Sequence, residues 1–126
     1  MKKQKNQYRS KFEQKIADQL TKKKIKFLYE PENIKYVMPE SKHNYKPDFK
    51  LPNGIYIETK GKWDSDSRKK MALVKEQHPE IDIRILFMRD QPIRKGSSTM
   101  YSDVCKKLGY QYAFKEIPTE WLGQTK

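Results

Sequence analysis

Cysteine is nearly absent from the sequence, since Cys105 is the only one. A single cysteine excludes an intrachain disulfide and a zinc site built from a cysteine cluster. Cys105 has the spacing of one helical face with Tyr101, Val104 and Leu108, and we expect it to be a small core residue. Long apolar runs are also missing, and no segment resembles a membrane span or the apolar part of a signal peptide. We therefore expect a soluble, cytoplasmic protein without a membrane partner or a small-molecule cofactor.

Acidic residues are scarce relative to basic ones, 16 against 28, and the net charge is +12. The first 26 residues contain ten Lys or Arg and two acids, so eight of these net charges lie there. This balance indicates a polyanionic partner. Nucleic acid fits better than an anionic membrane, because the basic stretch lacks the broad apolar face of a membrane anchor. With 126 residues the chain is expected to form one domain.

Two strand patterns, residues 46–51 and 55–60, flank a Pro-Asn-Gly turn that ends at Gly54. This arrangement is typical of a β-hairpin. A loop of three residues, with Gly54 at positive φ, pairs Phe49 with Ile57 and gathers the apolar side chains on one face. A loop of two residues would instead pair an apolar side chain with an acid. The pattern therefore predicts the three-residue loop.

The predicted register places two acids opposite each other on the second face of the hairpin, Asp48 and Glu58, with Lys60 on the same side. Opposed side chains lie about 4.5–5.5 Å apart at Cβ, so two like charges should repel. A divalent cation would remove that repulsion, because Mg²⁺ takes carboxylate oxygens as ligands. The spacing is that of the PD-(D/E)xK nuclease motif. The alternative is a solvated hairpin with mixed charges on its outer face.

Glu13 is the third acid of interest. Ser10 is a reasonable N-cap for a helix over residues 10–24, and Glu13 three residues later completes a capping-box pattern. Glu13 also lies at the edge of the helix face that carries the apolar residues, where it could point at the hairpin acids. The pattern leaves both roles open.

The remaining elements follow from periodicity and turn residues. Further strands are predicted at residues 26–30, 34–38, 81–87 and 110–115, and further helices at 64–77 and 99–108. The polar residues 39–44 are predicted to form a connector, and residues 89–99 a loop. This order predicts an α/β (mixed α+β) fold, in which a mixed sheet is flanked by helices.

Several motifs in one order resemble the phage endonuclease I family, the Holliday-junction resolvases of T-seven-like phages. The resemblance runs from residue 8 to residue 121. Its most specific stretches are Pro47-Asp48-Phe49, residues 51–55, Glu58-Thr59-Lys60-Gly61, residues 66–70 and residues 76–84.

The resemblance implies a restriction-endonuclease-like core with Asp48, Glu58 and Lys60 as the nuclease triad. It further implies two Mg²⁺ ions per active site, with Mn²⁺ as a substitute. One metal would be held by Asp48, Glu58 and the backbone carbonyl of Thr59, and the second by Asp48 and Glu13. The catalytic set is therefore expected to be Glu13, Asp48, Glu58 and Lys60.

The resemblance also implies an intertwined, segment-swapped homodimer. Residues 1–38 would form the N-terminal segment, 39–43 the bridge and 44–126 the main body of a single endonuclease domain. Glu13 would then complete the partner's active site. The expected substrate is branched DNA, in particular the four-way junction. Two alternatives remain: a non-catalytic nucleic-acid-binding module, and a PD-(D/E)xK endonuclease with duplex or mismatch specificity.

Nine side chains are candidates for contact with DNA because of their charge and position in the sequence. They are Lys5, Arg9, Lys11, His43, Lys62, Arg68, Lys69, Arg94 and Lys95. For His43 an exposed loop histidine is the alternative, and for Arg94 and Lys95 a solvated basic loop.

Overall fold

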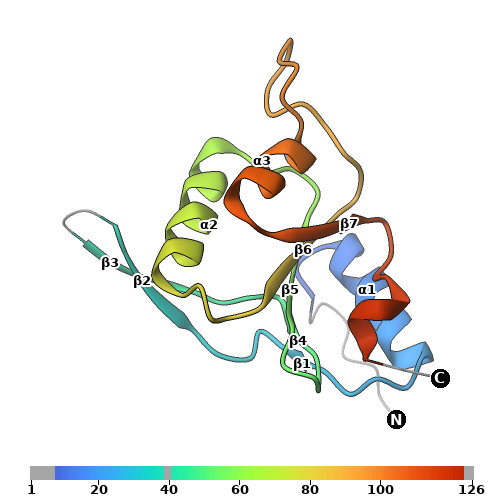
Figure 1. The fold of residues 1–126 in the computed structure, drawn as a ribbon. Coiled ribbons are helices and arrows are strands. Elements are labelled where there is room, and N and C mark those ends of the chain that lie inside the picture. Colours follow the sequence, from blue (N-terminus) through green and yellow to red (C-terminus); the bar gives the residue numbers. More distant parts are fainter. Residues whose placement is uncertain (1–7, 39–40, 124–126) are drawn as a thin grey trace.

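A five-stranded mixed sheet lies at the centre of the computed structural model, which describes residues 8–38 and 41–123 (Figure 1). Its strands, in spatial order, are β1 (Leu28–Tyr29), β4 (Phe49–Lys50), β5 (Tyr56–Lys60), β6 (Ile83–Phe87) and β7 (Gln111–Phe114). The pairs β1–β4 and β4–β5 are antiparallel, whereas β5–β6 and β6–β7 are parallel. The predicted mixed sheet flanked by helices is confirmed.

The hairpin between β4 and β5 has the predicted three-residue loop. Phe49 is paired with Ile57, and the Leu51 amide donates to the Ile55 carbonyl at 2.8 Å. Gly54 has φ +93°, the left-handed conformation that the turn requires. The paired part of β4 is shorter than predicted, but the register is the one that the apolar pattern demanded.

Helices cover the two faces of the sheet. One face is packed by α1 (Lys11–Lys22) and the short 3₁₀ helix η1 (Thr119–Leu122), the other by α2 (Ser65–Gln77) and α3 (Tyr101–Leu108) (Figure 1). Successive residues of a strand point to opposite faces. Accordingly, Ile57 belongs to the core beside α1, and Tyr56 to the core beside α2.

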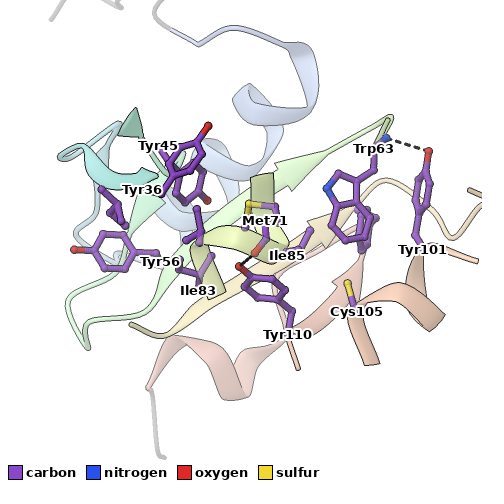
Figure 2. Packing of buried hydrophobic residues seen from close by; sticks show 13 residues of the cluster. Tyr36, Tyr45, Tyr56, Trp63, Met71, Ile83, Ile85, Tyr101, Cys105 and Tyr110 are labelled. Atoms are coloured by element: carbon purple, nitrogen blue, oxygen red, sulfur yellow. Dashed lines mark hydrogen bonds between the residues drawn. The ribbon is translucent and has the colours of Figure 1, made fainter. Parts of the chain in front are cut away.

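The core beside α2 and α3 is rich in aromatic side chains (Figure 2). Buried hydroxyl groups there find backbone partners: Tyr110 donates to the Met71 carbonyl at 2.6 Å, and the Trp63 amide donates to the Tyr101 oxygen at 3.0 Å. Cys105 is fully buried in this cluster, as predicted. These contacts tie α2 and the segment that leads into it to α3 and to the residue that precedes β7.

The predicted connector at residues 39–44 is wrong for Ser41–Asn44. These residues belong to β3 (Ser41–Tyr45), which pairs antiparallel with β2 (Ile34–Met38) in a separate two-stranded sheet. Strand β3 is polar along most of its length, and among its side chains at residues 42–45 only Tyr45 lies in the core. The strand forms because its backbone pairs with β2, and its sequence lacks the alternation of apolar and polar residues that would predict it.

The hairpin β2–β3 is held on α2 through backbone groups of β2. The Gln77 side chain donates to the Val37 carbonyl and accepts from the Val37 amide, both at 2.7 Å. The His78 ring nitrogen Nε2 lies 2.5 Å from the Lys35 carbonyl oxygen. In the part of the chain that the structure describes, no helix has the length and apolar character needed to cross a membrane.

The left-handed conformation of Gly54 yields a prediction for stability. Gly54→Ala should lower the free energy of unfolding by about 1–2 kcal/mol, since residues with a Cβ are disfavoured at positive φ. Gly54→Asn should cost less, because asparagine tolerates this conformation. Urea unfolding of both variants measures the difference, and an alanine variant as stable as the unmodified protein would contradict the assigned turn.

Candidate active site

Two carboxylates are buried together where β4 and β5 begin to diverge. Asp48 directly precedes β4, and Glu58 lies at the centre of β5. Their exposed fractions are only 8% and 5%. The register that pairs Phe49 with Ile57 places these two acids opposite each other one step further along. The predicted opposition of the acids therefore follows from the observed hairpin.

Asp48 is held by the residue that follows Glu58. Its Oδ2 atom accepts hydrogen bonds from the Thr59 amide and the Thr59 hydroxyl, both at 2.9 Å. Burial, and then the charge of Glu58, raise the pKa of Asp48 to about 8; the Thr59 amide opposes the shift. The site therefore favours a proton on Asp48 when no cation is near.

Glu58 is surrounded by groups that favour its charged form. Burial raises its pKa, and Lys60, Tyr45 and Lys70 act in the opposite direction. Lys60 Nζ lies 3.6 Å from Glu58 Oε2, and the Tyr45 hydroxyl donates to Glu58 Oε1 at 2.7 Å. Burial and the charge of Glu58 raise the pKa of Tyr45 well above its ordinary value, so this hydroxyl remains a donor.

Glu13 reaches the same cavity from α1. It is 6% exposed, and its Oε1 atom accepts from the Tyr29 hydroxyl at 2.6 Å and the Arg9 amide at 2.9 Å. Ser10 caps the helix by accepting from the Glu13 amide at 3.0 Å. The capping-box pattern is thus only half formed, because the Glu13 carboxylate contacts the Arg9 amide instead of the Ser10 amide. Glu13 adds to the rise in the pKa of Asp48.

A cavity of about 400 Å³ joins the predicted catalytic residues. Its lining includes Glu13, Asp48, Glu58, Thr59, Lys60, Arg9, Tyr45 and Lys70. Within residues 8–38 and 41–123, no three His, Cys, Asp or Glu side chains stand in an arrangement that could hold a metal ion. The carboxylates are instead occupied by Thr59, Tyr45 and Tyr29.

The donor set nevertheless fits a hard divalent cation. Such ions prefer carboxylate and carbonyl oxygens, and the cavity brings together three carboxylates, Glu13, Asp48 and Glu58. The raised pKa of Asp48 is the second sign of fit, since a nearby cation would stabilise the charge that burial and Glu58 disfavour.

The similarity of the chain to known proteins shows its family. The family model described as phage endonuclease I matches residues 1–126. The chain belongs to the phage endonuclease I family. "Endonuclease I" of Escherichia phage T7 is 52% identical over 120 residues, which cover 94% of this chain and 80% of that protein. "Endodeoxyribonuclease 1" of Enterobacteria phage T3 is also 52% identical over 120 residues, covering 94% and 79%.

The candidate DNA contacts of this family member are dispersed. Arg9 lines the acid cavity, where its Nε lies 2.9 Å from Glu30. Most of the others are exposed away from that cavity: Lys11, His43, Lys62, Lys69, Arg94 and Lys95. Lys5 lies outside the described residues. Arg68 is half-buried and donates to the Trp63 carbonyl at 2.6 Å, so its guanidinium also supports the start of α2.

Three residues of the site are additions to the predicted set. Tyr45 and Lys70 contact or influence Glu58, and Tyr29 holds Glu13. Lys70 Nζ lies 5.4 Å from the centre of the Tyr45 ring. The sequence offers no spacing rule that connects these residues to the motif, because they come from β3, α2 and β1.

The raised pKa of Asp48 predicts that the folded protein loses stability as the pH rises and Asp48 becomes charged. Its pKa is higher in the folded chain than the ordinary value of 3.8, so the folded state binds this proton more tightly. The resulting stability is present below pH 4 and is lost as the pH rises to about 8. Asp48→Asn stays neutral and can still accept from Thr59. In EDTA at pH 8 we expect its Tm to be roughly 5–10 °C above that of the unmodified protein.

Thermal unfolding at several pH values tests this expectation, and the difference in Tm should disappear near pH 4. Asp66→Asn is the matched control, since it removes an exposed carboxylate from α2. Equal Tm values of Asp48→Asn and the unmodified protein at pH 8 would contradict the proposed repulsion.

Proposed function

We propose that this protein is a Mg²⁺-dependent DNA endonuclease that resolves four-way and branched DNA junctions by hydrolysis of phosphodiester bonds. The observation that carries the proposal is the buried, opposed pair Asp48 and Glu58 with Lys60 at 3.6 Å from Glu58. The names of the two phage relatives, an endonuclease and an endodeoxyribonuclease, support it. A non-catalytic DNA-binding module has no need to bury two acids of like charge at a cost in stability.

The cation would be held by Asp48, Glu58 and the carbonyl of Thr59, and a second one by Asp48 and Glu13. When bound, Mg²⁺ or Mn²⁺ supplies a Lewis acid for the phosphodiester oxygens and activates water. Tyr45 orients Glu58 through its hydrogen bond of 2.7 Å. Thr59 orients Asp48 through two hydrogen bonds of 2.9 Å. These contacts preorganise the carboxylates before substrate arrives.

Lys60 would stabilise the charge that develops on the phosphate. Its ammonium group sits beside Glu58 and lines the same cavity as Asp48. A cationic side chain beside the acid pair suits an electrostatic role better than the role of a general base. Most recognition of the junction would involve phosphates and DNA shape, with few contacts to bases.

We further propose that the active protein is the segment-swapped homodimer, acting in the cytoplasm of the bacterial host. Glu13 reaches the acid pair from residues 1–38, which continue into the main body through the hairpin β2–β3. Opening this hairpin at residues 39–43 would let the same contacts form between two chains. A two-fold dimer carries two active sites, which suits paired, symmetric nicks across a junction.

Cleavage of a synthetic, immobile four-way junction tests the activity. With Mg²⁺ we expect paired nicks near the branch point and little cutting of a matched duplex, and with EDTA no cutting. Asp48→Asn and Glu58→Gln should abolish the nicks in Mg²⁺. Equal cutting of junction and duplex would support nuclease activity but contradict specificity for junctions. Binding without cuts would favour the non-catalytic module.

A mixed dimer tests the segment swap. Glu13→Ala and Asp48→Ala homodimers should each be inactive. After the two chains are unfolded and refolded together, a swapped heterodimer has one intact site, because one chain supplies Glu13 and the other Asp48. We therefore expect the mixture to nick one strand of the junction. In an unswapped dimer every site lacks one acid, and the mixture would stay inactive.

A further inference from the structure

A second cavity, of about 810 Å³, lies between α1 and the residues that follow β6 and β7. Four basic side chains and a single acidic one line it. The bases are Lys11, Lys15, Arg89 and Lys115, and they come from three separate parts of the chain. None of them belongs to the lining of the acid cavity described above.

Among the described residues, the four bases form no ion pair within 4.0 Å, although Glu116 lines the same cavity. Arg9, Lys60 and Arg84 each lie within 4.0 Å of a carboxylate, but no such pair forms at Lys11, Lys15, Arg89 or Lys115 in residues 8–38 and 41–123. All four residues are exposed. Converging unpaired cations repel one another and attract a polyanion. The four bases therefore contribute little to the stability of the fold and are suited to bind an anion.

The position of the cavity relates it to the acid site. The parallel strands β5, β6 and β7 end at the same edge of the sheet. Lys60 ends β5, Arg89 follows β6 and Lys115 follows β7. The carboxyl end of β5 therefore borders the acid cavity, and the residues after β6 and β7 border the basic cavity.

Helix α1 separates the two cavities. At about 100° per residue, Lys11 and Lys15 lie about 160° around the helix axis from Glu13. Glu13 lines the acid cavity, and the two lysines line the basic one. The apolar residues Phe12 and Ile16 also line the basic cavity. The two sites therefore lie on opposite flanks of α1.

The backbone at Lys115 supports a role for its side chain. Lys115 has φ +73°, and the Glu116 amide donates to the Phe114 carbonyl at 2.8 Å, which forms a γ-turn. Glycine adopts positive φ without penalty, whereas lysine does so at a cost. Strain of this kind is often located at functional sites. Here the strained residue directs a cation into the cavity.

We propose that this basic cavity binds phosphates of a DNA segment that flanks the scissile phosphate, on the opposite side of α1. The half-exposed side chain of Met88 would contact the sugars between those phosphates. This inference rests on the proposed DNA substrate but not on cleavage, because it concerns binding alone. It adds Lys15, Arg89 and Lys115 to the candidate DNA contacts.

The salt dependence of binding tests the proposal. Affinity for the four-way junction would be measured in EDTA over a range of salt concentrations. Lys15→Ala combined with Lys115→Ala should weaken binding and make the slope of log K against log salt shallower by about 2, since each phosphate contact contributes about 0.9. Lys24→Ala combined with Lys106→Ala is the control, because it removes the same charge from exposed residues outside the cavity.

Two outcomes would overturn the proposal: an unchanged slope in the cavity variant, and an equal change in the control, which would indicate a diffuse effect of net charge. Because the measurement needs no cleavage, the proposal survives if the unmodified protein binds the junction but does not cut it.

Glycine variants test whether misfolding, and not the loss of a phosphate contact, causes weaker binding. Lys24 also has positive φ, +59°, so Lys24→Gly and Lys115→Gly both relieve backbone strain and both remove one charge. We expect both to raise Tm, and only Lys115→Gly to weaken binding and lower the slope by about 1. Weaker binding by Lys24→Gly to the same extent would contradict the proposal.

Discussion

The opposed burial of Asp48 and Glu58 is the constraint on which the rest of the site depends. The apolar face of the hairpin can be buried in only one register, the one that pairs Phe49 with Ile57. That register also sets the two acids against each other on the second face. The neighbours of the acids, Thr59 for Asp48 and Tyr45 for Glu58, hold them in place. The packing of one face thus determines the chemistry of the other.

Helix α1 is the element that connects the acid site to the wider surface. Its apolar stripe packs on the sheet, with Ile16 and Leu20 almost fully buried. One flank places Glu13 beside the acid pair, and the opposite flank places Lys15 in the basic cavity. A small rotation of this helix would therefore displace an acid and a base in opposite directions. The tight packing of the stripe opposes such a rotation.

Much of the site could be predicted from the sequence because short-range rules determine it. The turn ending at Gly54 fixes the register, and the register fixes which acids oppose each other. Glu13 could be assigned to the buried edge of α1 from helical periodicity, but its companion Tyr29 lies on another element. Tyr45 and Lys70 were missed for the same reason, since packing between elements brings them to Glu58.

The basic residues were harder to assign because charge alone does not distinguish a DNA contact from structural support. Arg68 illustrates this point, since its guanidinium donates to the Trp63 carbonyl. Lys115 illustrates the opposite case, a candidate DNA contact that the sequence does not reveal. Nothing in its local sequence indicates the positive φ that directs its side chain into a cavity. The strand β3 was predicted as a connector because its polar residues lack the alternation that burial on one face produces.

The contact between Gln77 and Val37 has a consequence for the behaviour of the protein at high concentration. A strand with free amide and carbonyl groups at its edge can recruit strands from other molecules and start aggregation. The Gln77 side chain occupies the amide and the carbonyl of Val37 as a neighbouring strand would. Growth of the small sheet is thereby blocked on the β2 side. On the β3 side, Lys42, His43 and Asn44 present polar side chains that disfavour such growth.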